Sequence, residues 1–249
     1  DGRLTELHVD RGDKQSHVGN VYLGRVVRVL PGMQAAFVDI GLERAAFLYA
    51  GDIYPEFVEN TSAAGIQDPD ATVTEARPRA APRAGQPPIQ DLIKEGQEVL
   101  VQVAKDPIGT KGARITTHIT LPGRYMVFMP TVDHVGISRR IERDRERRKL
   151  RDFVEKYRPK GCGFIVRTVC EGKPMSALKQ DIDYLISTWA RIQETSRTSK
   201  APMCIHADHG LVLRVVRDGF NESVNRMVLD DRGQFDEVQR FMNDLMPLL

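Results

Sequence analysis

The sequence has 249 residues, of which 41% are hydrophobic and 28% are charged, with a formal net charge of +2. This balance is typical of a globular protein with a buried core and excludes the disordered and collagen-like classes. Because the chain is close to neutral, its overall charge predicts no partner, and any electrostatic argument depends on local clusters.

The N-terminus begins Asp1-Gly2-Arg3, without a starting Met or a signal peptide. No stretch approaches the roughly 18 apolar residues that a membrane-spanning helix needs. We therefore expect a trimmed, cytoplasmic chain with no membrane partner. The three cysteines have no C-x-x-C spacing, which favours buried thiols over a disulfide framework or a zinc ribbon.

Residues 19–53 contain three short runs rich in Val, Phe and Ala, separated by Pro31-Gly32 and by a second break at Gly41. Such runs between turn residues predict three strands in a meander. Residues 55–90 carry six prolines amid small and charged residues and predict a mobile surface insertion. Strands are expected again at 98–105 and 112–117, which completes five, the number in an OB-fold barrel.

An α+β region follows the barrel. We expect strands at 124–129 and 163–168, a charged helix at 142–157 and a long helix at 175–195. The long helix is predicted by apolar residues at helical spacing, which are Leu178, Ile182, Leu185 and Trp189. The tail reads as strands at 211–216 and 227–229, then a helix at 235–248.

Phe37 and Phe47 lie ten residues apart on neighbouring predicted strands. Aromatic rings exposed on an OB-fold can stack on nucleic-acid bases, although filling the core is the commoner role of phenylalanine. Lys111 lies in a glycine-flanked loop from which a cation could reach a phosphate, or it is an ordinary surface lysine.

Arg167 and Thr168 end an apolar strand, where a guanidinium and a hydroxyl could hold a phosphate monoester together. The alternative is a strand end with a surface ion pair. Residues 139–151 contain eight Lys or Arg and three Asp or Glu, a pattern that favours a polyanion unless the helix is simply solvated.

The segment 206–209, His-Ala-Asp-His, precedes a glycine and is interpreted as a turn rather than a metal site. No hydrolase motif or metal-binding carboxylate pair is evident in the sequence. We therefore assign no catalytic residue and no metal ligand.

Longer segments carry a family resemblance. They are GNVYLGRV (19–26), LPGMQAAFVDIGLERAAFL (30–48), KDPIGTKGARITTHITLPGRYMVFMP (105–130), HVGISRRIE (134–142) and GFIVRT (163–168). Together they resemble the N-terminal half of the bacterial ribonuclease E/G family, most closely its G branch.

The resemblance implies an α+β multidomain fold, in which an S1-type OB-fold β-barrel and an α+β 5′-sensor domain are inserted into a partial ribonuclease H-like fold. The barrel would cover 19–122 and the sensor 123–204, while residues 1–18 and 205–249 would belong to the ribonuclease H-like fold. By the same resemblance Phe37, Phe47 and Lys111 contact RNA, and Gly123, Val127, Arg167 and Thr168 bind a 5′-phosphate, the first two through their backbone.

Members of the family are endoribonucleases of ribosomal RNA maturation and messenger RNA decay that act on 5′-monophosphorylated single-stranded RNA. The resemblance places the aspartates that hold Mg²⁺ after Leu249, so we expect this chain to bind RNA without cleaving it, and to form homo-oligomers only within the full-length protein. The alternatives are a noncatalytic S1-type RNA-binding scaffold module and a structural protein whose basic helix serves solubility alone.

Overall fold

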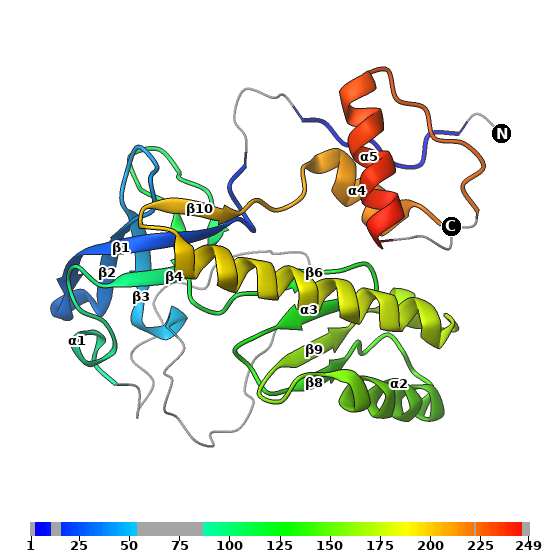
Figure 1. The fold of residues 1–249 in the computed structure, drawn as a ribbon, viewed down its shortest axis with the longest axis horizontal. Helices are drawn as coiled ribbons and strands as arrows, with labels where there is room; N and C mark the ends of the chain where they lie inside the picture. The colour runs from blue at the N-terminus through cyan, green and yellow to red at the C-terminus, as the bar shows by residue number, and fades with distance from the viewer. Residues whose placement is uncertain (1–2, 11–15, 54–86, 222, 246–249) are drawn as a thin grey trace.

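The computed structural model describes residues 3–10, 16–53, 87–221 and 223–245. They form two sheets and a helical C-terminal region, with the long helix α3 (Met175–Thr198) running across the middle of the molecule (Figure 1). The predicted insertion, 55–90, lies outside the described residues except for its last four positions. Among the helices that the structure describes, none is long and apolar enough to cross a membrane.

The first sheet closes into a five-stranded barrel. Its strands are β1 (Val21–Leu30), β2 (Ala35–Asp39), β3 (Ala46–Tyr49), β4 (Glu98–Lys105) and β5 (Arg114–Thr116). The neighbour order is β1-β2-β3-β5-β4, and β4 pairs back onto β1 to close the ring. Only the β3–β5 pair is parallel among these contacts. The five predicted strands and the closed barrel are confirmed, and the arrangement is consistent with an OB-fold.

The turn after β1 forms as the sequence predicts. Pro31 begins a short 3₁₀ helix, Pro31–Met33, and Gln34 follows in the left-handed conformation with φ at 49°. A second 3₁₀ turn, Ala50–Asp52, ends β3, and the short helix α1 (Ile89–Leu92) packs under the barrel. Strand β10 (Met203–His206) pairs with the free edge of β1, a pairing that no local pattern predicts.

The second sheet has the order β6-β7-β9-β8, with strands β6 (Leu121–Pro122), β7 (Met126–Met129), β8 (Val135–Ile137) and β9 (Gly163–Val166). Helices α2 (Asp144–Tyr157) and α3 cover one face, and they bury Phe128, Phe164 and Val166 together with Leu178 and Ile182. Both helices match their predicted ranges to within a few residues, because each repeats its apolar side chains at helical spacing over several turns.

The prediction of strands in the tail is wrong. Residues Leu211–Gly219 form helix α4, residues 227–229 form no regular element, and helix α5 spans Arg232–Leu245. The run LVLRVV is rich in β-branched residues, but Leu213 and Val216, three residues apart, both face α5 and are buried. A short apolar run does not distinguish a strand from a helix until the partner that buries it is known.

Candidate nucleic-acid interface

Two phenylalanines lie side by side on the outer face of the barrel. Phe37 on β2 is the register partner of Phe47 on β3, and their ring centroids are 6.0 Å apart in an edge-to-face arrangement. Both are half-buried, whereas the alternating residues of these strands, such as Val38 and Leu48, are 0% exposed and fill the core. Because side chains alternate across a strand, the two rings belong to the solvent face of the barrel.

Arginines flank this pair in the direction across the strands. Arg28 on β1 is opposite Phe37, and Arg114 on β5 is opposite Phe47. Arg28 is exposed, and Arg114 makes a two-nitrogen contact with Asp52 through Nε at 3.1 Å and Nη2 at 2.9 Å. The order Arg28, Phe37, Phe47, Arg114 places two flat rings between two cations in a single row, which we call the aromatic row.

Lys111 is exposed in the loop between β4 and β5, close to the start of β5. The next residue, Gly112, presses against the backbone of the β2–β3 connection, since a Cβ added there would lie 2.0 Å from the Ala45 carbonyl oxygen. Immediately after it, the Ala113 carbonyl accepts the backbone N–H of Phe47 at 2.7 Å. The loop is therefore fixed beside the strand that carries Phe47.

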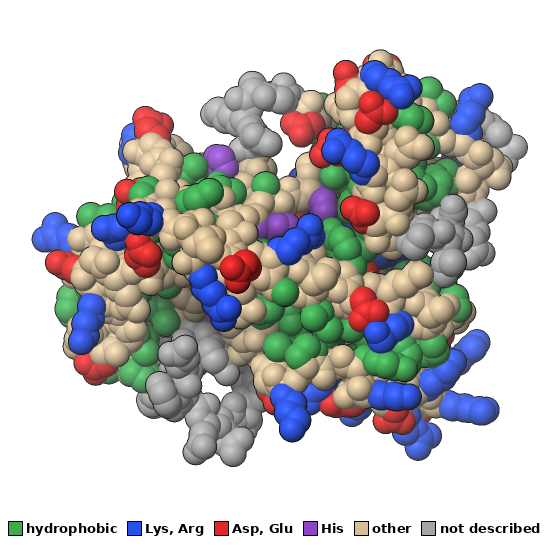
Figure 2. All heavy atoms as spheres, in the orientation of Figure 1, with side chains coloured by type: hydrophobic (Ala, Val, Ile, Leu, Met, Phe, Trp, Pro, Cys, Tyr) green, Lys and Arg blue, Asp and Glu red, His purple; other side chains and the backbone are tan. Residues whose placement is uncertain are grey.

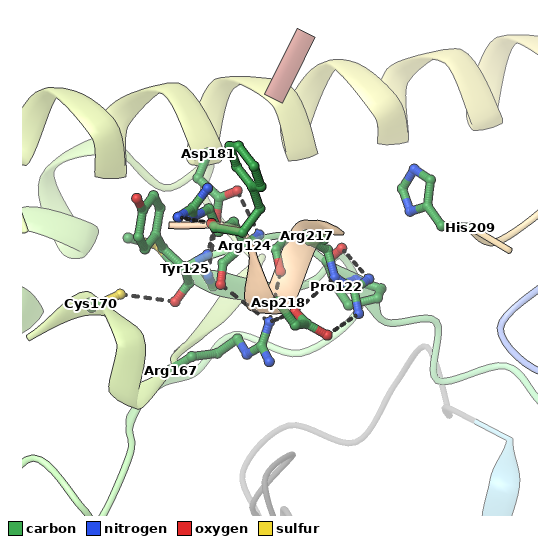
Figure 3. Close-up of polar contacts among 12 residues, drawn as sticks. Pro122, Arg124, Tyr125, Arg167, Cys170, Asp181, His209, Arg217 and Asp218 are labelled. Atoms are coloured by element: carbon green, nitrogen blue, oxygen red, sulfur yellow. Dashed lines mark hydrogen bonds and ion pairs between the residues drawn. The ribbon is translucent and has the colours of Figure 1, made fainter. Parts of the chain in front are cut away.

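Arg167 leaves the end of β9 and points under the β6–β7 hairpin (Figure 3). Its Nη1 donates to the carbonyl oxygens of Gly123 and Arg124, both at 3.2 Å, and to Oδ1 of Asp218 at 2.7 Å. No described residue accepts a hydrogen bond from its Nε or Nη2. The side chain keeps 18% of its surface exposed. One edge of the guanidinium is thus fixed by the protein, while the other has no protein partner in the described regions of the chain.

Thr168 begins a 3₁₀ turn directly after Arg167, and its hydroxyl lies 2.8 Å from that of Ser138. The Ser138 amide donates to the Val166 carbonyl at 2.9 Å, which joins this hydroxyl pair to the end of β9. The Val127 side chain packs with Met129 and Ile165, in a small apolar group separate from the main core. Of the four residues predicted for the phosphate, Gly123 and Arg167 are in direct contact.

A buried carboxylate holds the hairpin that carries Gly123. Asp181 on α3 is 1% exposed and accepts the backbone N–H groups of Arg124, Tyr125 and Met126 at 2.9 to 3.0 Å. Burial raises the pKa of Asp181 to about 6, although these three donors act to lower it. The strand expected at 124–129 begins at Met126, after the first two of these three amides.

Asp218, near the end of α4, is shared by two arginines. Arg217 donates to it through Nε at 3.1 Å and Nη2 at 3.0 Å, and Arg167 donates to Oδ1. Burial acts to raise the pKa of Asp218, but hydrogen bonds from the two arginines lower it overall. Arg217 also donates to the Pro122 carbonyl at 3.3 Å, so α4 is connected to the hairpin as well as to Arg167.

The basic run 139–151 covers the turn before α2 and the first half of that helix. Figure 2 shows Lys and Arg side chains gathered over this edge of the molecule. Arg147 is an exception, because its Nη1 bonds to the carbonyls of Ser138 at 2.7 Å and Ile141 at 2.9 Å. The exposed members are Arg139, Arg140, Arg143, Arg145, Arg148, Lys149 and Arg151. Arg147 therefore has a structural role, whereas the other basic side chains of the run are exposed, with Lys149 near Glu146 at 3.9 Å.

No three His, Cys, Asp or Glu residues among those that the structure describes lie close enough together to hold a metal ion. The segment 206–209 does not form the predicted turn, because His206 ends strand β10 and residues 207–210 have no regular structure. Burial lowers the pKa of His209 to about 4, and its ring packs on Phe241, with centroids 4.7 Å apart. The described residues thus supply no ligand set for the Mg²⁺ that the resemblance implies, and no step of metal chemistry is assigned to them.

Residues 120–249 match the model of the ribonuclease E/G family. The chain belongs to the ribonuclease E/G family. It is 42% identical to Ribonuclease G of Escherichia coli K12 over 246 residues, which are 99% of this chain and 47% of that protein. It is 41% identical to Ribonuclease G of Haemophilus influenzae over 248 residues, and 38% identical to Ribonuclease E of Nostoc over 243 residues, or 32% of the latter's length. The chain spans about half the length, or less, of these curated relatives.

Two carboxylates of this ribonuclease E/G chain were missed by sequence reasoning. Asp181 lies on the same helical stripe as Leu178 and Leu185, so a polar residue inside an apolar stripe was a signal that could have found it. Asp218 carried no such signal. It lies just after the strand predicted at 211–216, and its contact with Arg167 joins residues that are 51 positions apart.

Proposed function

We propose that this chain is the RNA-recognition portion of an endoribonuclease, and that it binds single-stranded RNA with a 5′-monophosphate. In this proposal the aromatic row and Lys111 contact the RNA chain, and Gly123, Val127, Arg167 and Thr168 hold its 5′ end. The observation that carries the proposal is the aromatic row itself, because half-exposed rings beside arginines offer the two kinds of group that bind a single strand, which are aromatic surface for bases and positive charge for phosphates.

Stacking supports the contact with the RNA chain. Each base stacked on an aromatic ring contributes about 1 to 3 kcal/mol, and every base offers a flat face. The edge-to-face geometry of Phe37 and Phe47 leaves both rings partly open to solvent. Arg28, at one end of the row, is exposed and offers a positive charge to a flanking phosphate, which would add binding that weakens with salt, whereas Arg114 at the other end is already paired with Asp52.

The fixed guanidinium of Arg167 supports the contact with the 5′ end. Its Nε and Nη2 edge has the geometry that pairs with two oxygens of one phosphate. The neighbouring Thr168 hydroxyl adds a second donor or acceptor. A pocket built for one terminal phosphate is expected to exclude a triphosphate by crowding and by charge.

The chemistry of cleavage belongs, in this proposal, to the full-length protein. There, Mg²⁺ held after Leu249 would supply the activated water, and the protein would act in the cytoplasm on ribosomal precursors and messenger RNA, as a homo-oligomer. The 249-residue chain is expected to bind RNA and not to cut it. Turnover of single-stranded RNA by the purified chain in Mg²⁺ would contradict this expectation and exclude the scaffold alternative.

Fluorescence anisotropy with a labelled single-stranded 12-mer tests the binding claims, with salt held constant and the 5′ end as hydroxyl, monophosphate or triphosphate. The double variant Phe37→Ala/Phe47→Ala should weaken binding of all three RNAs by at least tenfold, given about 1 to 3 kcal/mol per stacked base. Phe235→Ala, an exposed phenylalanine on α5, is the matched control and should have no effect. Unchanged binding by the double variant would exclude the aromatic row.

Arg167→Ala tests the phosphate site separately. It should abolish the preference for the monophosphate end while most of the salt-dependent binding remains. Arg232→Ala, which removes an 83% exposed arginine of α5, controls for the change in net charge. Equal affinity of the unaltered chain for hydroxyl and monophosphate ends would exclude the sensor claim and leave the aromatic row standing.

A further inference from the structure

The orientation of Arg167 depends on a residue outside the segment expected to form the sensor. All three acceptors of Arg167 in the described structure bond to one nitrogen, Nη1, and the shortest of these bonds is to Asp218 at 2.7 Å. Asp218 lies on α4, whereas the two carbonyls belong to the β6–β7 hairpin. Arg167 is therefore held between two segments of the chain that are distant in sequence.

The carboxylate of Asp218 is itself fixed from the other side. Arg217 contacts both of its oxygens, and the Arg217 side chain is 8% exposed. Arg217 is anchored in turn to the Pro122 carbonyl. Figure 3 shows the carboxylate lying between the two guanidinium groups. Because both of its oxygens accept hydrogen bonds from Arg217, the carboxylate has little freedom to rotate away from Nη1 of Arg167.

We propose that Asp218 is a positioning residue for the 5′-phosphate site. This inference rests on the proposed function, and it adds that α4 completes the site. By holding Nη1, Asp218 turns the Nε and Nη2 edge of Arg167 toward the ligand and fixes a side chain that otherwise has many rotamers. The terminal phosphate then meets two donors already in position.

The hydrogen bonds between Asp218 and Arg167 distinguish a positioning role for Asp218 from competition with the 5′-phosphate. A carboxylate that took the place of the phosphate would bond to the edge of the guanidinium that faces the ligand. Asp218 bonds instead to the nitrogen that the hairpin carbonyls also use, and it leaves Nε and Nη2 without a partner among the described residues. Asp218 therefore supports the binding geometry rather than blocking it.

The test is the ratio of dissociation constants for hydroxyl-ended and monophosphate-ended 12-mers, measured for the unaltered chain, Asp218→Asn, Asp218→Glu, Arg167→Ala and the double variant Asp218→Asn/Arg167→Ala. Asp183→Asn is the matched control, because it removes a charge from a partly exposed aspartate that is paired with Lys179. Melting temperatures confirm that each variant folds, which is expected because the Asp218 side chain is 38% exposed.

Asp218→Asn should lower the monophosphate preference about tenfold, the effect of losing one charge-assisted hydrogen bond that orients the fork. Asp218→Glu, which keeps the charge, should retain more of the preference than Asn. In the Arg167→Ala background the Asn change should have no further effect, because Asp218 acts through Arg167. Asp183→Asn should leave the ratio unchanged.

A full preference in both Asp218 variants would overturn the positioning role, as would a stronger preference, which would indicate competition. Either result would leave the proposed phosphate site intact, because the unaltered chain would still discriminate between the two ends. Absence of any preference in the unaltered chain would instead overturn the phosphate site, and the role of Asp218 with it.

Discussion

The buried carboxylate of Asp181 should by itself contribute stability in mild acid, which is opposite to the effect of an ordinary salt-bridged aspartate. Burial raises its pKa from 3.8 to about 6 against the pull of three backbone donors. In the unfolded chain the carboxyl loses its proton near pH 3.8, while in the folded protein it keeps the proton until about pH 6. The resulting stabilisation is complete below the unfolded pKa and is lost as the pH rises through the folded pKa.

The size of the effect follows from these two values. At pH 5 a carboxyl with a folded pKa of about 6 is about nine-tenths protonated, and the unfolded one is almost fully ionised, so proton linkage adds about 1 kcal/mol to the free energy of unfolding. At pH 7.5 both states are ionised and the contribution vanishes. Asp181→Asn removes the titration, so only the unaltered protein should gain this stability in acid.

Urea unfolding followed by circular dichroism, at pH 5 and at pH 7.5, measures the difference. In the Asn variant the side-chain NH₂ group faces one of the backbone N–H groups, so one hydrogen bond is lost at a cost of about 1 to 3 kcal/mol. This cost is the same at both pH values, so it cancels when the two differences in stability are compared. Asp183→Asn changes an exposed neighbour on the same helix, and its difference in stability from the unaltered protein should be the same at both pH values. An equal difference between Asp181→Asn and the unaltered protein at both pH values would refute the reasoning, as would a larger advantage for the unaltered protein at pH 7.5.

Two further predictions concern the same region. Gly123→Ala should lower the free energy of unfolding by about 1 to 3 kcal/mol in thermal or urea unfolding, because the added Cβ would lie 2.6 Å from Oδ1 of Asp181. Gly219→Ala is the control, because a Cβ added there meets no atom within 4 Å. Equal stability of the two variants would contradict the prediction. Burial raises the pKa of the Cys170 thiol, which is 0% exposed. Iodoacetamide at pH 8 should therefore label the exposed Cys204 first, as followed by mass spectrometry. Early labelling of Cys170 would contradict the prediction, because it would show that the core around Cys170 opens to solvent.

The secondary structure was predictable where apolar periodicity extended over many residues or where proline and glycine marked the ends of an element. Helix α3 repeats its apolar residues over many turns, and the strands of the barrel are bounded by proline and glycine. The errors fell on short segments. Helix α4 was expected as a strand because a short run of apolar and β-branched residues fits either form, and β10 was not expected because only the free edge of β1 makes it a strand.

Residue type and spacing were enough to predict the barrel strands, the two long helices and the candidate residues Phe37, Phe47 and Arg167. Each of these depends on residue type and on spacing over a few positions, which the chain displays directly. The bonds from the hairpin amides to Asp181, and from Arg167 to Asp218, become visible in the folded chain alone. Hydrogen bonds of this kind join groups more than 50 residues apart, and they form only when packing brings the helices against the hairpin, so no local pattern records them.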